Sequence, residues 1–121
     1  MPAVPISVIE VEPFLSRSAA IWSDDERSAF IDFIARNPLA GRIIPGTGGV
    51  RKIRWSRAGL GKRGGARIIY YFYNANRPVY LLTAYAKARQ PDLTPGQKRV
   101  IIAIVEEIQA EWAGSAGRTG R

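Results

Sequence analysis

The sequence predicts a small α+β domain, with helices packed on one face of an antiparallel sheet. Three β-rich runs follow one another through short connections in the second half of the chain, an arrangement that favours an antiparallel meander. Apolar residues at helical spacing stand on both sides of these runs, as expected for helices that cover a sheet. We therefore expect the order β-α-α-β-β-β-α in a single domain of residues 1–113, followed by a disordered tail at 114–121.

The first half of the chain supplies one strand and two helices. Residues 4–11 are rich in Val and Ile, which is typical of a strand, and the apolar residues of 14–22 indicate a short helix. Ser23 and Glu26 then form a capping box, in which each side chain bonds the backbone N–H of the other residue. The second helix is expected to end before Pro38, because the residue that precedes a proline avoids the helical conformation.

The second half supplies three strands and a third helix. The strands are expected at 50–56, 66–73 and 79–87, where β-branched and aromatic residues gather. Thr94 and Gln97 form a second capping box. The apolar stripe of the helix that follows consists of Val100, Ile101, Ile104, Val105, Ile108 and Trp112.

Positive charge is concentrated in the middle of the chain. The stretch between Asp32 and Asp92 has no acidic residue but holds 12 of the 18 Lys and Arg residues. A segregated positive charge creates a local field that attracts polyanions, so nucleic acid is the first partner to consider. The chain has no Cys and no His, which excludes disulfides and removes the usual general base and metal ligand. Paired carboxylates and a metal-dependent nuclease site are disfavoured as well, because the central strands lack acids.

The location of the protein is also constrained by its apolar pattern. No apolar run approaches the roughly 20 residues that a membrane span needs. The N-terminus lacks a basic start followed by a long apolar core, so no secretory signal is evident. We expect a cytoplasmic protein.

A glycine-rich segment at 59–64 matches the dinucleotide-binding pattern G-x-G-x-x-G. That pattern has to open a helix, so that the pyrophosphate meets the helix N-terminus, whereas strand-forming residues follow here. A phosphate loop is excluded too, because Arg63 stands where that motif requires Ser or Thr. We interpret the segment as a flexible basic connection and expect no nucleotide cofactor.

Four basic residues are expected to converge on one face of the sheet. Lys52 and Arg54 alternate onto the same face of their strand, Arg67 begins the next strand, and Lys87 ends the third. Cations packed together repel one another unless an anion lies between them, so the pattern indicates a phosphate site. The alternative is a solvated basic surface. The further candidates for substrate binding are Arg51, Arg57, Lys62 and Arg63.

Two tyrosines are candidates to stack on an RNA base. Tyr71 shares a face of its strand with Arg67, and Tyr85 shares a face with Lys87. An aromatic ring beside cations can stack on an unpaired base. Packing within the sheet is the alternative for each ring, and the sequence does not choose between the two.

Three segments resemble the RelE/HigB family of bacterial toxins, and the HigB-like branch most closely. They are Gly-Thr-Gly-Gly-Val-Arg-Lys-Ile-Arg at 46–54, the glycine loop with its Arg-Ile-Ile-Tyr-Tyr-Phe strand at 61–72, and Leu-Leu-Thr-Ala-Tyr-Ala-Lys at 81–87. The order of helices and strands is similar too, so the resemblance covers nearly the whole chain. It implies a RelE-like fold and the toxin of a type II toxin-antitoxin system that cuts messenger RNA in the ribosomal A site.

The resemblance further implies cleavage without a metal or another cofactor. In the implied reaction the ribose 2′-OH attacks the adjacent phosphate, leaving a 2′,3′-cyclic phosphate and a free 5′-OH. Carried over by motif, the site residues are Lys52, Arg54, Arg67 and Lys87. Their roles are assigned here by physical chemistry: Lys52 is expected to assist deprotonation of the 2′-OH, and Arg67 to stabilise the charge that builds on the phosphate. Arg54 holds the phosphate, and Lys87 neutralises or protonates the leaving 5′ oxygen. The family often has Arg at this last position, and Lys is the better proton donor but the poorer bidentate clamp.

The implied partners are a cognate helix-turn-helix antitoxin (HigA-like), the ribosome and its message. Operator DNA is bound only through the antitoxin, and no membrane is involved. Two other functions stay open at this point. ParE-like members of the same superfamily share the fold, lack the full basic set and act on gyrase, while a non-catalytic nucleic-acid-binding module is the second alternative.

Overall fold

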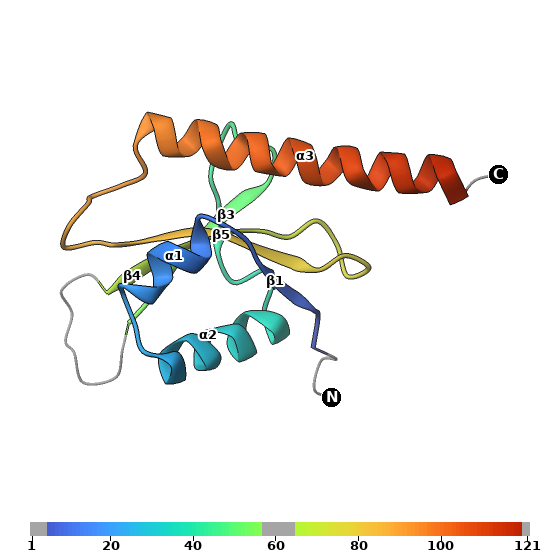
Figure 1. Cartoon of the computed structure of the whole chain (residues 1–121). Helices are drawn as coiled ribbons and strands as arrows, with labels where there is room; N and C mark the ends of the chain where they lie inside the picture. The colour runs from blue at the N-terminus through green and yellow to red at the C-terminus, as the bar shows by residue number, and fades with distance from the viewer. Residues whose placement is uncertain (1–4, 57–64, 120–121) are drawn as a thin grey trace.

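The computed structural model, which describes residues 5–56 and 65–119, confirms the expected α+β class (Figure 1). A single five-stranded sheet in the order β1-β5-β4-β3-β2 lies at its centre. In chain order the elements are β1 (Val8–Glu10), α1 (Phe14–Ala19), α2 (Asp24–Arg36), β2 (Arg42–Ile43), β3 (Val50–Trp55), β4 (Ala66–Tyr71), β5 (Val79–Ala86) and α3 (Pro95–Thr119).

The sheet is mixed rather than wholly antiparallel. The meander expected for the second half is confirmed, because β3 pairs antiparallel with β4 and β4 with β5. A short strand that the sequence did not reveal, β2, pairs antiparallel with β3. The first strand, however, pairs parallel with β5, so the prediction of an antiparallel sheet is wrong at this edge. Parallel neighbours need a long crossover between them, and two helices and three strands separate β1 from β5.

Helices cover both faces of the sheet, and the prediction that they share one face is wrong. Residues of α1, α2 and one side of β4 and β5 form one core, which includes Phe14, Phe30 and Ile68. Residues of α3 and the other side of the sheet form a second core, which includes Ile69 and Ile101. Figure 1 shows α3 on the side of the sheet opposite to α2. A strand that is buried on both faces has an almost continuous run of apolar residues in its sequence, and β4 has such a run.

Both predicted capping boxes are present. Ser23 Oγ accepts a hydrogen bond from the backbone N–H of Glu26, and the Glu26 carboxylate accepts one from the backbone N–H of Ser23. The side chains and backbone N–H groups of Thr94 and Gln97 exchange the same pair of bonds at the start of α3. Helix α3 continues to Thr119, past the boundary at residue 114 where the sequence predicts a disordered tail.

Candidate nucleic-acid interface

The register of the central strands sets three side chains in a row across the sheet. Arg54 on β3 lies directly opposite Arg67 on β4, and Arg67 lies directly opposite Tyr85 on β5. Side chains of directly opposite residues stand on the same face, with Cβ atoms about 5 Å apart. Arg54 is exposed, Arg67 is partly exposed and Tyr85 is buried, so the row runs from solvent inward toward the second core.

Lys52 joins this row through an acidic residue in the connection between β5 and α3. It stands on the same face of β3 as Arg54, because the two are separated by one residue. Its Nζ lies 3.4 Å from Asp92 Oδ1, and the hydroxyl of Tyr85 donates to the same oxygen at 3.3 Å. Lys52, Arg54, Arg67 and Tyr85 thus form one surface, which we call the basic face.

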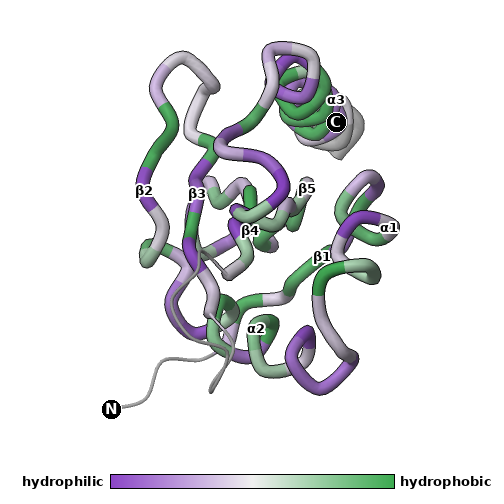
Figure 2. Tube along the Cα trace, turned by 90° about the vertical axis from the view of Figure 1, so that its left-hand side faces the viewer, coloured by the Kyte–Doolittle hydropathy of each residue, from purple (hydrophilic) through white to green (hydrophobic). Residues whose placement is uncertain are grey.

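Lys87 belongs to the same end of the sheet. It follows β5 directly, and its backbone N–H donates to the carbonyl of Gly65, next to the start of β4. Its Nζ donates to the carbonyl of Pro91 at 2.7 Å, in the same connection that carries Asp92. Figure 2 looks onto this end of the molecule, where hydrophilic parts of β3 and of the connection before α3 are in view together.

The ionisable groups of the interface influence one another. Burial, helped by the charge of Asp92 and the hydrogen bond to it, raises the pKa of Tyr85 to about 12, while Arg67 acts in the opposite direction. The phenol therefore stays protonated and remains a donor near neutral pH. A hydrogen bond from the backbone N–H of Leu93 is the main reason that the pKa of Asp92 is lowered; burial acts in the opposite direction, and Lys52 and Tyr85 add to the lowering. Asp92 is therefore a carboxylate near neutral pH.

Two predicted substrate-binding residues lie elsewhere. Arg51 points to the opposite face of β3, where its guanidinium donates to the carbonyl of Gly41 at 2.7 Å. Tyr71 is 1% exposed, its ring stacks against Trp112 of α3, and its hydroxyl accepts from Gln109. Neither side chain is part of the basic face. The three other candidates, Arg57, Lys62 and Arg63, lie outside the described residues, as does the glycine-rich motif at 59–64.

Asp92 is the residue of this interface that the sequence pattern did not single out. The charge pattern marked it only as the end of the acid-free stretch, and its partner Lys52 lies 40 positions away in the chain. A signal was nevertheless present, since Asp92 is the one acidic residue between Asp32 and Glu106. A single carboxylate inside a long basic region is a candidate counter-ion for that region.

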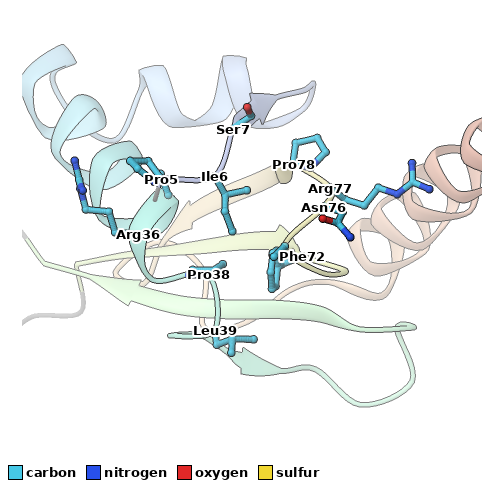
Figure 3. Close-up of a pocket in the computed structure, with 12 residues that line it drawn as sticks. Pro5, Ile6, Ser7, Arg36, Pro38, Leu39, Phe72, Asn76, Arg77 and Pro78 are labelled. Atoms are coloured by element: carbon cyan, nitrogen blue, oxygen red, sulfur yellow. The ribbon is translucent and has the colours of Figure 1, made fainter. Parts of the chain in front are cut away.

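Other features of the molecule lie away from the basic face. A cavity of about 660 Å³ opens beside the C-terminal end of α2, lined mostly by apolar side chains such as Ile6, Pro38 and Phe72 (Figure 3). No residue of the basic face lines this cavity.

Among the described residues, no group of three or more acidic, His or Cys side chains is placed to hold a metal ion. None of the helices in the described ranges is both long and apolar enough to span a membrane.

Comparison with known proteins establishes the fold. No protein-family model matches the chain. Its structure is similar to that of the E. coli toxin RelE, solved in the free state as a mutant in which two arginines are replaced by alanine. The match has a TM-score of 0.50 at 14% sequence identity and covers 73% of this chain and 90% of the toxin. The chain therefore has a RelE-like fold.

Proposed function

We propose that this chain, with residues 1–113 as a single toxin domain, is the toxin of a type II toxin-antitoxin system. In this proposal it acts as a ribosome-dependent endonuclease that cuts messenger RNA, as members of the HigB-like branch do. The observation that carries the proposal is the row formed by Arg54 and Arg67 on neighbouring strands, with Lys52 on the same face. The RelE-like fold supports it, since the similar E. coli protein is itself a toxin.

The proposed reaction is a transfer of the phosphoryl group within the RNA strand. The 2′ oxygen forms a bond to the adjacent phosphorus while the bond from phosphorus to the 5′ oxygen breaks. One proton leaves the 2′-OH and another reaches the 5′ oxygen. Negative charge builds on the phosphate oxygens in between, and the guanidinium groups of Arg54 and Arg67 can stabilise it with paired hydrogen bonds. No metal or other cofactor takes part in the proposed reaction.

Lys52 and Lys87 are proposed to act on the two protons of this reaction, the one that leaves the 2′-OH and the one that reaches the 5′ oxygen. Lys52 assists removal of the proton from the 2′-OH, and Lys87 neutralises or protonates the leaving 5′ oxygen. An ammonium has no lone pair and cannot accept a proton. The role of Lys52 as a base therefore requires it to leave its contact with Asp92 and to give up its own proton before it takes the proton of the 2′-OH.

Tyr85 is proposed to orient the substrate through its hydroxyl rather than through base stacking. Its ring is 4% exposed, which leaves little of the aromatic face for a base, and its hydroxyl lies within the interface. Arg57, Lys62 and Arg63 are proposed to add phosphate contacts along the strand, as their charge suggests.

The proposed partners follow from the same function. The ribosome presents the message, and a cognate helix-turn-helix antitoxin (HigA-like) neutralises the toxin, through which alone operator DNA is bound. An acidic segment of that antitoxin would complement the basic face. The proposed location is the cytoplasm, where translating ribosomes are found.

The test is expression of the chain from a tightly repressed promoter, followed by mapping of new 5′ ends in cellular RNA. Cuts confined to translated reading frames, together with growth arrest, are expected. The variant Arg67→Ala should relieve the arrest and remove the cuts while the protein still accumulates. Growth arrest with intact messages and inhibited gyrase would favour the ParE-like alternative. RNA binding without cleavage would favour a non-catalytic module.

A further inference from the structure

Asp92 holds the central position among the donors of the interface. Its Oδ1 accepts from Lys52 Nζ at 3.4 Å, from the hydroxyl of Tyr85 at 3.3 Å and from the backbone N–H of Leu93 at 2.8 Å. These donors come from β3, from β5 and from the connection before α3. One carboxylate oxygen thus gathers an ammonium, a phenol and an amide N–H.

This set of donors suits a phosphate oxygen as well as a carboxylate oxygen. Phosphate contacts in nucleic-acid complexes come from Lys and Arg, from hydroxyl groups and from backbone N–H groups. An anion beside a group of cations also lowers their mutual repulsion. In the protein without RNA, the Asp92 carboxylate is such an anion and lies against Lys52.

We propose that the Asp92 carboxylate occupies the place of a substrate phosphate oxygen and is displaced when RNA binds. The Asp92 side chain is 68% exposed and that of Lys52 is 36% exposed, so their ion pair is of the weak, solvent-screened kind. Its exposure leaves the side chain room to turn outward. Asp92 then competes with the RNA phosphate for the same donors, so other phosphate groups bind more weakly to the free protein. Displacement of Asp92 by RNA releases Lys52 for its proposed role.

This inference rests on the proposed function for the identity of the phosphate, but its test does not require cleavage. The probe is a single-stranded RNA whose riboses are all 2′-O-methylated, so that no 2′-OH is available to attack. Its affinity is measured by fluorescence anisotropy for the wild type, for Asp92→Asn and for Glu107→Gln. Glu107 is an exposed acid on α3, and its variant controls for the loss of one negative charge.

Asp92→Asn should bind the RNA about two- to fivefold more tightly than Glu107→Gln does, which is the range expected for loss of a weak ion pair that competes with the ligand. The side chain of Asn still accepts from the Leu93 N–H. Should this variant fold poorly, Asp92→Ser offers a hydroxyl acceptor at the same place. Equal or weaker binding by the Asp92 variants would overturn the inference and assign Asp92 to another role, such as that of a base.

A double-mutant cycle with Lys52→Met locates the effect. If Asp92 competes through Lys52, the gain in RNA affinity from Asp92→Asn should be smaller in the Lys52→Met background, and an undiminished gain would contradict that.

Titration with inorganic phosphate, followed by the NMR signal of the Leu93 amide, compares the wild type and Asp92→Asn without RNA. Cleavage mapping separates this inference from the function: tighter binding without any cleavage overturns only the function, and cleavage without tighter binding overturns only the inference.

Discussion

The hydroxyl of Tyr70 ties the connection between α2 and β2 to the middle of the sheet. It accepts from the backbone N–H of Gly41 at 2.8 Å and donates to the carbonyl of Pro38 at 2.8 Å. The side chain of Tyr70 is 0% exposed. Arg51 donates to the carbonyl of Gly41 from the neighbouring strand. Together these bonds hold the chain that leads into β2 and β3, and β3 carries Lys52.

The variant Tyr70→Phe should destabilise the fold by about 2 to 3 kcal/mol. Phenylalanine keeps the ring and leaves no large cavity, so the cost comes from the two backbone groups that lose their partner. An ordinary hydrogen bond contributes about 1 kcal/mol net, and a buried group left unsatisfied costs about 1 to 3 kcal/mol. A cost of about 1 to 1.5 kcal/mol for each of the two groups, at the low end of that range, gives the stated total, which is a large share of the ~5–15 kcal/mol of a typical domain.

The measurement is urea-induced unfolding followed by tryptophan fluorescence, with Tyr73→Phe as the matched control. Tyr73 is 60% exposed, so loss of its hydroxyl should change the free energy of unfolding by less than about 0.5 kcal/mol. Burial raises the pKa of Tyr70 above its ordinary 10.0, so its contribution is complete below pH 10 and is lost only as the pH rises further. If the two variants unfold within about 0.5 kcal/mol of each other near pH 7, the reasoning is refuted.

Three further predictions concern a glycine, a tyrosine and a lysine. Gly41→Ala places a Cβ 2.9 Å from the backbone carbonyl of Lys52 and should lower the free energy of unfolding by about 1 to 3 kcal/mol. The control Gly114→Ala meets nothing within 4 Å and should raise the thermal midpoint slightly. If Gly41→Ala proved the more stable of the two variants, the α2–β2 connection would have moved to make room for the Cβ. Tyr85 has a pKa of about 12, so in a pH titration followed by ultraviolet absorbance its phenolate should form at higher pH than that of an ordinary tyrosine. Its contribution to the stability of the fold should be complete below pH 10 and lost between pH 10 and 12. Asp92→Asn should shift this titration to lower pH, because the charge of Asp92 raises the pKa of Tyr85. Lys87→Arg should slow cleavage on translating ribosomes about tenfold or more, because guanidinium releases a proton poorly; an unchanged rate would leave Lys87 only a neutralising role.

Much of the fold was predictable from local patterns in the sequence. The capping boxes at Ser23 and Thr94 are local motifs, and both are present. The strands β3, β4 and β5 are predicted by their β-branched and aromatic residues, and the short connections between them predict an antiparallel meander. The shared face of Lys52 and Arg54 follows from simple alternation along one strand.

Features that depend on distant pairing were missed. The parallel pairing of β1 with β5 leaves no local signal, since it depends on how the chain returns after the two helices. The two-residue strand β2 is too short to show a pattern. The position of α3 was readable in part, because the strand from Ala66 to Tyr71 is almost entirely apolar and therefore needs cover on both faces.

The candidate site divides in the same way. Arg54 and Arg67 are brought together as the order of the strands implied. Tyr71 was placed correctly on its strand but lies beneath α3, and only the position of that helix decides whether the ring is exposed. The contact between Lys52 and Asp92 joins the sheet to a connection, and alternation within strands says nothing about such a contact.

We propose that the basic face binds RNA so that a ribose 2′-OH attacks the adjacent phosphate. The proposal is tested by the chemistry of the ends formed when the purified protein acts on a message held by translating ribosomes. We expect fragments with a 5′-hydroxyl and a 2′,3′-cyclic phosphate for the wild type, and intact message for Arg67→Ala. Fragments that carry 5′-phosphates, or equal cleavage by Arg67→Ala, would contradict it.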